Sequence, residues 1–243
     1  MGESLKGKVA IITGGGRGIG AATARLFARE GAQVVIASRT QHELQGIIAQ
    51  IEDESGKGKA LAVVADVSRE EEVQQLFGEC LATFGTLDIL VNNAAVIEKR
   101  DFIDFDAETW DSIMAVNIRG SFLCSREAFR QIEKAGRGGC IVNLSSLSGV
   151  RGPEKFPGMS SYVVSKYAVT GLTESLAVEG KPLGIRVNCV APGAVETAML
   201  RKAAPFLKTS TTPEDVARTI LFLADESQTR HMTGALIEIF SNE

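Results

Sequence analysis

The sequence predicts a doubly wound α/β fold, a seven-stranded, mostly parallel sheet with helices on both faces. Short apolar runs alternate with longer helical patterns along the chain, and this alternation is typical of parallel sheets. The apolar runs are β-branched and nearly continuous, as expected for strands that helices cover on both faces. No repeat, low-complexity tract or linker interrupts the pattern, so we expect residues 1–243 to form a single domain.

Seven apolar runs are the expected strands. They lie at residues 8–13, 33–37, 60–65, 87–91, 140–144, 185–190 and 235–240. Each run is short, and helical patterns or turn residues separate it from the next one, which favours crossover connections.

Three of the intervening helices carry end signals. Residues 17–31 end on Gly31, a residue that commonly stops helices. Residues 68–85 start with Ser68 as the expected N-cap, with acidic residues in the first turn and a glycine at the end. Residues 212–224 start with Thr212 as N-cap and a proline at the first helical position.

Composition excludes several classes of protein. A chain of 243 residues buries roughly 70–75% of its unfolded surface, so it needs neither disulfides nor metal to fold. The net charge of −4 argues against nucleic acid as a partner, because nucleic-acid binding calls for a basic face. No apolar stretch approaches the ~18 residues of a membrane span, so we expect no membrane insertion.

Cysteine and histidine usage points away from metal and disulfide chemistry. The four cysteines are widely spaced, none forms a CxxC pair, and the chain has only two histidines. We therefore expect no metal site and no redox pair. The N-terminus lacks the long apolar run of a secretory signal. Reduced, buried thiols in a cytoplasmic protein fit these observations best.

A glycine-rich loop follows the first expected strand and opens the first helix. Within TGGGRGIG, residues 13–20, the spacing of Gly14, Gly18 and Gly20 is G-x-x-x-G-x-G. Glycines in this position let the backbone approach a pyrophosphate, and a helix N-terminus offers free N–H groups with a partial positive charge. The loop predicts a dinucleotide site, with a glycine-rich turn that binds nothing as the alternative.

The end of the second strand distinguishes between two dinucleotides. NAD-binding sheets usually carry an acid here that bonds the ribose hydroxyls. This chain has Ser38 followed by Arg39 instead. An arginine binds a 2′-phosphate as a two-pronged fork, and Arg17 in the glycine loop is placed to reach the same group. The two arginines favour NADP(H) over NAD(H), unless both are merely solvated.

The stretch SSYVVSKYAV, residues 160–169, pairs a phenol with an amine. If it is helical, Tyr162 and Lys166 share one face and Tyr167 points elsewhere. A cation within ~4–6 Å favours the phenolate and lowers the pKa of a phenol by about 1–3 units. Tyr162 would then exchange a proton with a bound alcohol or carbonyl. The alternative is a pair that only packs on a helix surface.

Further motifs follow in a fixed order. They are Asp66-Val67 after the third strand, Asn92-Asn93-Ala94-Ala95 after the fourth, Asn117, Ser145-Ser146 after the fifth, Tyr162-x-x-x-Lys166, and Pro192-Gly193 after the sixth. Together with the glycine loop, they resemble the short-chain dehydrogenase/reductase family over nearly the whole chain, nearest to the 3-oxoacyl-carrier-protein reductases and related carbonyl reductases. The resemblance implies a Rossmann fold.

The resemblance also implies roles for single residues. Tyr162 would be the catalytic acid/base, and Lys166 its partner and a ligand of the nicotinamide ribose. Ser146, rather than Ser145, would hold the substrate oxygen, and Asn117 would hold a water that relays protons through Lys166. The residues implied in cofactor binding are Gly14, Arg17, Gly18, Ile19, Gly20, Ser38, Arg39, Asp66, Val67, Asn93, Ala94, Tyr162, Lys166, Pro192, Gly193, Val195 and Thr197.

These inferences predict an NADP(H)-dependent oxidoreductase that moves a hydride between nicotinamide and a small carbonyl or secondary alcohol. One alternative is a 3-oxoacyl-carrier-protein reductase, although Leu183 stands where carrier-dependent relatives tend to have a basic residue. Another is a non-catalytic NADP-binding module, since fold likeness alone does not fix function. The family resemblance further implies a homo-oligomer, a dimer or a tetramer. Residues 194–211 are shorter than this subgroup usually carries, which predicts an open substrate pocket.

Overall fold

The computed structural model describes residues 3–241, and its strands form one sheet in the order β3-β2-β1-β4-β5-β6-β7. All neighbouring pairs are parallel, so the predicted doubly wound sheet is confirmed. Each predicted strand end agrees with the structure to within two residues. The strands are β1 (Val9–Thr13), β2 (Gln33–Ser38), β3 (Ala60–Val64), β4 (Ile89–Asn92), β5 (Gly139–Leu144), β6 (Ile185–Pro192) and β7 (Leu236–Ile239).

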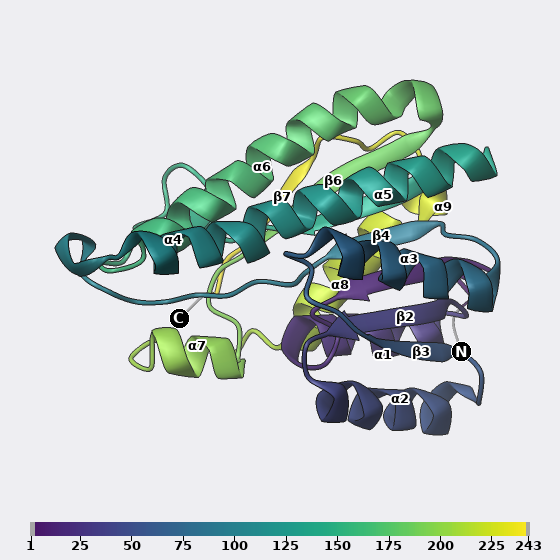
Figure 1. Ribbon diagram of the computed structural model, residues 1–243, viewed down its shortest axis with the longest axis horizontal. Coiled ribbons are helices and arrows are strands. Elements are labelled where there is room, and N and C mark those ends of the chain that lie inside the picture. Colours follow the sequence, from purple (N-terminus) through teal and green to yellow (C-terminus); the bar gives the residue numbers. More distant parts are fainter. Residues whose placement is uncertain (1–2, 242–243) are drawn as a thin grey trace.

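Helices cover both faces of the sheet (Figure 1). Because side chains of a strand alternate between faces, Ile12 packs in one core with Phe27 of α1, while Ile11 packs in the other with Phe77 of α3. The first core is covered by α1 (Gly18–Arg29), α2 (Gln41–Ser55) and α8 (Pro213–Ala224), and the second by α3 (Glu70–Phe84), α5 (Gly120–Ala135) and α6 (Ser160–Gly180).

The shorter elements lie in the connections between strands and longer helices. They include α4 (Ala107–Met114), the π-helical turn η2 (Ala115–Arg119), the 3-10 turn η3 (Leu147–Gly149), α7 (Ala198–Ala203) and α9 (Glu226–Thr229). Among the described residues, no helix is long and apolar enough to cross a membrane, and no cluster of three potential metal ligands occurs. As predicted, all four cysteines are buried, and all are free thiols.

Two predicted helix starts have different outcomes. Thr212 caps α8 as predicted, since its hydroxyl accepts from the Asp215 amide and Asp215 accepts in return from the Thr212 amide. The prediction for Ser68 is wrong: α3 starts at Glu70, and its N-cap residue is Arg69, which makes no side-chain cap bond. The Ser68 hydroxyl instead donates to Asp66 Oδ1 at 2.7 Å.

The sheet order brings the motif-bearing turns to one edge. The order reverses between β1 and β4, and in such sheets ligands bind outside the carboxyl ends of the strands at the point of reversal. The glycine loop follows β1, Asn93 follows β4, Ser146 follows β5, and Pro192 ends β6. Segments far apart in the sequence therefore meet at this edge.

Candidate active site

The glycine loop has a backbone that only glycine accommodates. Gly14 and Gly18 have φ angles of 65° and 54°, in the left-handed region that other residues rarely adopt. A Cβ on Gly20 would lie 2.3 Å from the Gly14 carbonyl oxygen. The three glycines of the predicted pattern are therefore each required by the geometry of this turn.

Asn93 ties this loop to the end of β4. Its Nδ2 donates to the carbonyl oxygens of Thr13 at 2.9 Å and Gly14 at 3.1 Å, and its amide donates to Thr13 Oγ1 at 3.0 Å. The side chain of Asn93 thus holds two turns of the sheet edge together. It is this arrangement that keeps the glycine loop and Ala94 facing the same cleft.

A cleft of about 610 Å³ runs from the glycine loop to Tyr162 and Lys166. Of the predicted cofactor residues, Gly20 is not among those that line the cleft, and Gly193 and Val195 line a neighbouring cavity. The other predicted cofactor residues all line the cleft: Gly14, Arg17, Gly18, Ile19, Ser38, Arg39, Asp66, Val67, Asn93, Ala94, Tyr162, Lys166, Pro192 and Thr197.

The neighbouring cavity, of about 320 Å³, shares Tyr162 with the cleft and contains Ser146. Its wall is mainly apolar and includes Leu147, Phe156, Met159, Leu200 and Leu207. The short segment after β6 still reaches this wall, because Phe206 packs edge-on against Phe156 with the ring centroids 5.8 Å apart. Tyr162 therefore stands where the two spaces join.

Tyr162 lies close to both Ser146 and Lys166. The Ser146 hydroxyl lies near enough to the Tyr162 phenol to favour its ionised form and so act against the rise of its pKa. Lys166 Nζ lies 5.5 Å from the centre of the Tyr162 ring and donates to the Leu144 carbonyl at 2.7 Å. Ser145 is directed away from this group, since its Oγ donates to the Lys166 carbonyl at 2.8 Å. The structure thus places Ser146, and not Ser145, against the phenol.

Tyr167 is directed elsewhere, as the helical spacing predicts. Its hydroxyl donates to the Val150 carbonyl at 2.7 Å, and the side chain is partly exposed. It lines neither of the two spaces next to Tyr162. The two tyrosines of the chain therefore have separate environments, although only five positions separate them.

Burial controls the protonation of the phenol and the amine. Desolvation raises the pKa of Tyr162 to about 12, although the nearby Ser146 hydroxyl opposes this rise. Desolvation also lowers the pKa of Lys166 to about 8. The expected lowering of the Tyr162 pKa is wrong for this arrangement, because the loss of water around the buried phenol decides the direction of the shift.

Asn117 lies in the π-helical turn η2 and is buried. Its Oδ1 accepts from the Val96 amide at 2.8 Å, and its Nδ2 donates to the Val96 carbonyl and to Ser165 Oγ, both at 3.0 Å. The side chain therefore joins the loop after β4 to α6. Its implied role as the holder of a proton-relaying water stays a prediction.

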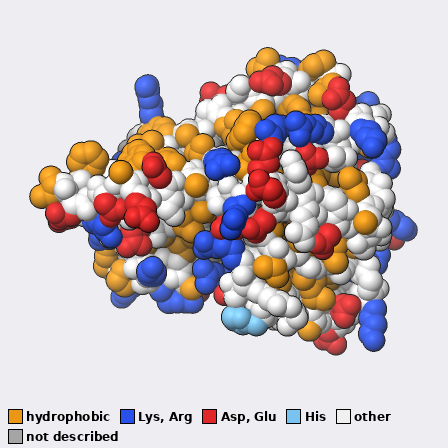
Figure 2. All heavy atoms as spheres, in the orientation of Figure 1, with side chains coloured by type: hydrophobic (Ala, Val, Ile, Leu, Met, Phe, Trp, Pro, Cys, Tyr) orange, Lys and Arg blue, Asp and Glu red, His pale blue; other side chains and the backbone are white. Residues whose placement is uncertain are grey.

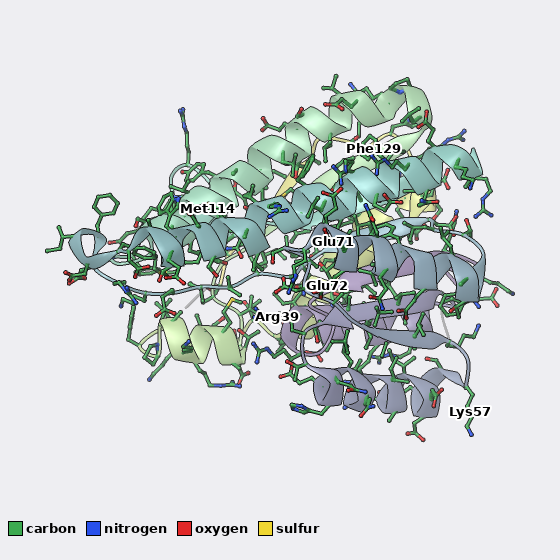
Figure 3. The ribbon with its side chains drawn as sticks, in the orientation of Figure 1. Arg39, Lys57, Glu71, Glu72, Met114 and Phe129 are labelled. Atoms are coloured by element: carbon green, nitrogen blue, oxygen red, sulfur yellow. The ribbon has the colours of Figure 1, made fainter. Side chains whose placement is uncertain are left out.

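At the end of the cleft beside β2, which the sequence predicts as the adenine end, both arginines are paired with acids. Arg17 lies 3.4 Å from Glu43, and Arg39 lies 3.8 Å from Asp66, while their side chains remain 72% and 62% exposed. Figure 2 shows basic and acidic side chains interspersed over the middle of this face, where Figure 3 labels Arg39 and Glu72. The end of the cleft thus presents exposed positive groups beside more buried negative ones.

Two acids at this end were missed by sequence reasoning. Glu43 lines the cleft, and Glu72 accepts from the Asp66 amide at 2.8 Å. Burial opposes ionisation of Asp66, but bonds from Ser68 and the charge of Arg39 hold its pKa below the ordinary value. Nothing in the sequence sets Glu43 and Glu72 apart, because acids in a first helical turn are common for electrostatic reasons alone.

Comparison with known proteins gives a consistent result. The family model described as short chain dehydrogenase matches residues 8–207. A short chain dehydrogenase/reductase of Aspergillus oryzae is 36% identical, covering 98% of this chain and 95% of its own. A 3-oxoacyl acyl-carrier-protein reductase of Thermotoga maritima is 35% identical, covering 97% of both chains.

A solved structure is also similar to this chain, in both fold and sequence. A 3-ketoacyl acyl-carrier-protein reductase from Brucella melitensis, complexed with NADH, superposes with a TM-score of 0.89 at 33% identity, covering 97% of both chains. The likeness thus extends over the whole sheet and both helical layers.

The glycine loop provides a direct test of the site's backbone. Gly20→Ala should destabilise the protein by about 1–3 kcal/mol, because the new methyl group has no room beside the Gly14 carbonyl. Gly46→Ala is the matched control: Gly46 lies inside α2, and a Cβ added there would meet no atom within 4 Å. It should stabilise the protein by roughly 0.5–1 kcal/mol. Guanidinium unfolding measures both, and equal effects would contradict the assigned loop geometry.

Proposed function

The chain belongs to the short chain dehydrogenase family of oxidoreductases, and from this we propose that it transfers a hydride between NADP(H) and a carbonyl or secondary alcohol. The observation that carries this proposal is the position of Tyr162. Its phenol joins the cleft of the glycine loop to the cavity that contains Ser146. The apolar wall of that cavity supports a small, mainly apolar substrate.

The residues of the cleft fit a dinucleotide. Gly14 and Gly18 line the cleft without a side chain of their own, so a pyrophosphate can approach their backbone, and α1 begins at Gly18. Its first amides and the partial charge of its N-terminus suit phosphate oxygens. When bound, the nicotinamide supplies the hydride.

The protein's own residues handle the proton. With a pKa of about 12, the Tyr162 phenol keeps its proton at neutral pH and can donate it to a substrate oxygen that gains negative charge. The Ser146 hydroxyl donates a second hydrogen bond to the same oxygen. Lys166, buried on the same helix face, stabilises the phenolate that remains after transfer.

The preference for NADP(H) rests on the adenine end. Ser38 occupies the position where NAD-binding sheets usually carry an acid. Arg17 and Arg39 are exposed enough to exchange their acidic partners for a 2′-phosphate. Glu43 and Asp66 work against this choice by competing for the same guanidinium groups. The structure of the Brucella relative is complexed with NADH. The proposed preference for NADP(H) is therefore based on the arginines of this chain and not on that relative.

A carrier-linked substrate is the second candidate, because 3-oxoacyl acyl-carrier-protein reductases are among the relatives of this chain. It differs from the first only in the length and attachment of the acyl group. A purely NADP-binding module is opposed by the retention of Tyr162, Ser146 and Lys166.

For assembly, we infer a dimer or tetramer. Exposed apolar side chains on α5 and α6 support this, among them Phe122, Val164 and Val178.

Removing the proton donor tests the role of Tyr162. Tyr162→Phe should lower kcat by about 10²–10⁴ while NADPH binding stays nearly unchanged, because the ring remains and only the hydroxyl is lost. Steady-state kinetics and fluorescence titration measure the two quantities. Tyr167→Phe is the matched control: it loses one hydrogen bond to the Val150 carbonyl and no group of either cavity, so its loss of kcat should stay below about tenfold. A Tyr162→Phe enzyme with more than about a tenth of wild-type kcat would refute the assignment.

The pKa of Lys166 predicts how kcat/KM for carbonyl reduction depends on pH. Its pKa of about 8 means that the amine is charged below this value and neutral above it. The charged form stabilises the phenolate left by proton donation, so kcat/KM for reduction should fall as the pH rises through about 8. A pH series with buffer controls measures this. A profile that stays flat between pH of about 7 and 9 would show that Lys166 does not govern proton transfer.

Arg39 tests the cofactor preference. Arg39→Asp removes a fork donor and places a negative charge near the 2′-phosphate, so NADPH should bind at least about tenfold more weakly, while NADH should be less affected. Arg130→Asp on α5, which lies outside the cleft, is the control for the change of charge. Equal Kd values for NADPH in wild type and Arg39→Asp would leave Arg17 as the sole basis for the preference.

A further inference from the structure

Lys155 lies in the loop between η3 and α6, outside the group formed by Tyr162 and Lys166. Its Nζ donates to three main-chain carbonyls, those of Leu147 at 2.8 Å, Val150 at 2.5 Å and Pro153 at 2.9 Å. An ammonium group has three donors and no acceptor, so all three donors of Lys155 are used within this loop.

The shape of the loop depends on that cation. Three carbonyl oxygens directed at one point repel each other unless a positive group lies between them. The loop is also fixed to α6, because Tyr167 donates to the Val150 carbonyl at 2.7 Å and Thr170 Oγ1 to the Gly149 carbonyl at 3.3 Å. Lys155 lies over the Tyr167 ring as well, with Nζ 5.6 Å from its centre. Lys155 and α6 therefore hold this loop from two sides, and together these contacts form a clamp.

The clamped loop is a wall of the cavity next to Tyr162. Ser146, Leu147 and Pro153 all line this cavity. Ser146 is the N-cap of η3, directly before this loop, and its hydroxyl accepts from the Ser148 amide at 3.1 Å. The Leu147 carbonyl held by Lys155 belongs to the residue directly after Ser146, so a shift of that peptide moves the serine hydroxyl with it.

We propose that Lys155 is a positioning residue: it fixes the backbone that aims the Ser146 hydroxyl at Tyr162 and shapes the wall from Leu147 to Pro153. This inference rests on the proposed function, because it assumes that Ser146 holds the substrate oxygen. Lys155 itself touches neither reacting atoms nor cofactor. Its effect on catalysis passes through the backbone.

Lys155→Met removes the three donors and keeps the apolar stem. Displacement of a catalytic group by about 1 Å costs up to roughly 10²-fold in rate, so kcat/KM should fall by at least about tenfold, while the Kd for NADPH is unchanged. Lys155→Arg, which retains charge and donors, should recover part of the loss. Lys57→Met is the control, because Lys57 is exposed, lines neither cavity and is labelled well away from Arg39 in Figure 3.

A double-mutant cycle with Ser146→Ala distinguishes positioning from general support. If Lys155 acts through Ser146, Lys155→Met should cost little more in the Ser146→Ala background, whereas independent effects would multiply. Amide hydrogen exchange of residues 147–152 should rise in Lys155→Met whatever the turnover. Unchanged exchange, or an equal loss in both backgrounds, would overturn the inference. A wild type that reduces no carbonyl would overturn the proposed function instead, with exchange still deciding whether the clamp exists.

Discussion

The candidate active site depends on one buried hydrogen bond, from Lys166 Nζ to the Leu144 carbonyl at 2.7 Å. Lys166 is only 3% exposed, and an ammonium group buried without a partner is costly. Leu144 ends β5, two residues before Ser146, so this bond fixes α6 against the strand end that carries the serine. Because Tyr162 lies one turn before Lys166, the same bond brings the phenol to Ser146. The chemistry of the site therefore follows from how a buried lysine is satisfied.

Burial then shifts the pKa values of Tyr162 and Lys166 in opposite directions. It raises the pKa of Tyr162 and lowers that of Lys166, since desolvation always disfavours the charged form. A pair of groups whose pKa values are pushed in opposite directions indicates which is acid and which is electrostatic partner. In the proposed function the Tyr162 phenol is therefore the proton donor, and Lys166 makes turnover sensitive to pH near neutrality. The proposed role of Lys155 is to hold the backbone next to Ser146.

Sequence reasoning predicted the sheet well because buried parallel strands are continuous apolar runs, and it predicted the glycine loop because its backbone excludes side chains. It placed Tyr162 and Lys166 on one helix face. Spacing contains no information on burial, so the predicted direction of the Tyr162 pKa shift was wrong. Ser68 was misassigned because a serine before acids can bond Asp66 instead of capping. Glu43 and Lys155 act through contacts between distant segments or loop backbone, which no local pattern reveals.

Reduction of a carbonyl with NADPH by Tyr162 and its partners is tested most directly by cofactor oxidation against a panel of carbonyls. NADPH and NADH are compared in parallel, with free ketones and acyl thioesters as separate arms. We expect faster oxidation of NADPH than of NADH with small apolar ketones. Acyl thioesters should be the better substrates only if the natural reaction is carrier-linked. NADPH that binds but is oxidised by no carbonyl in the panel would contradict this mechanism.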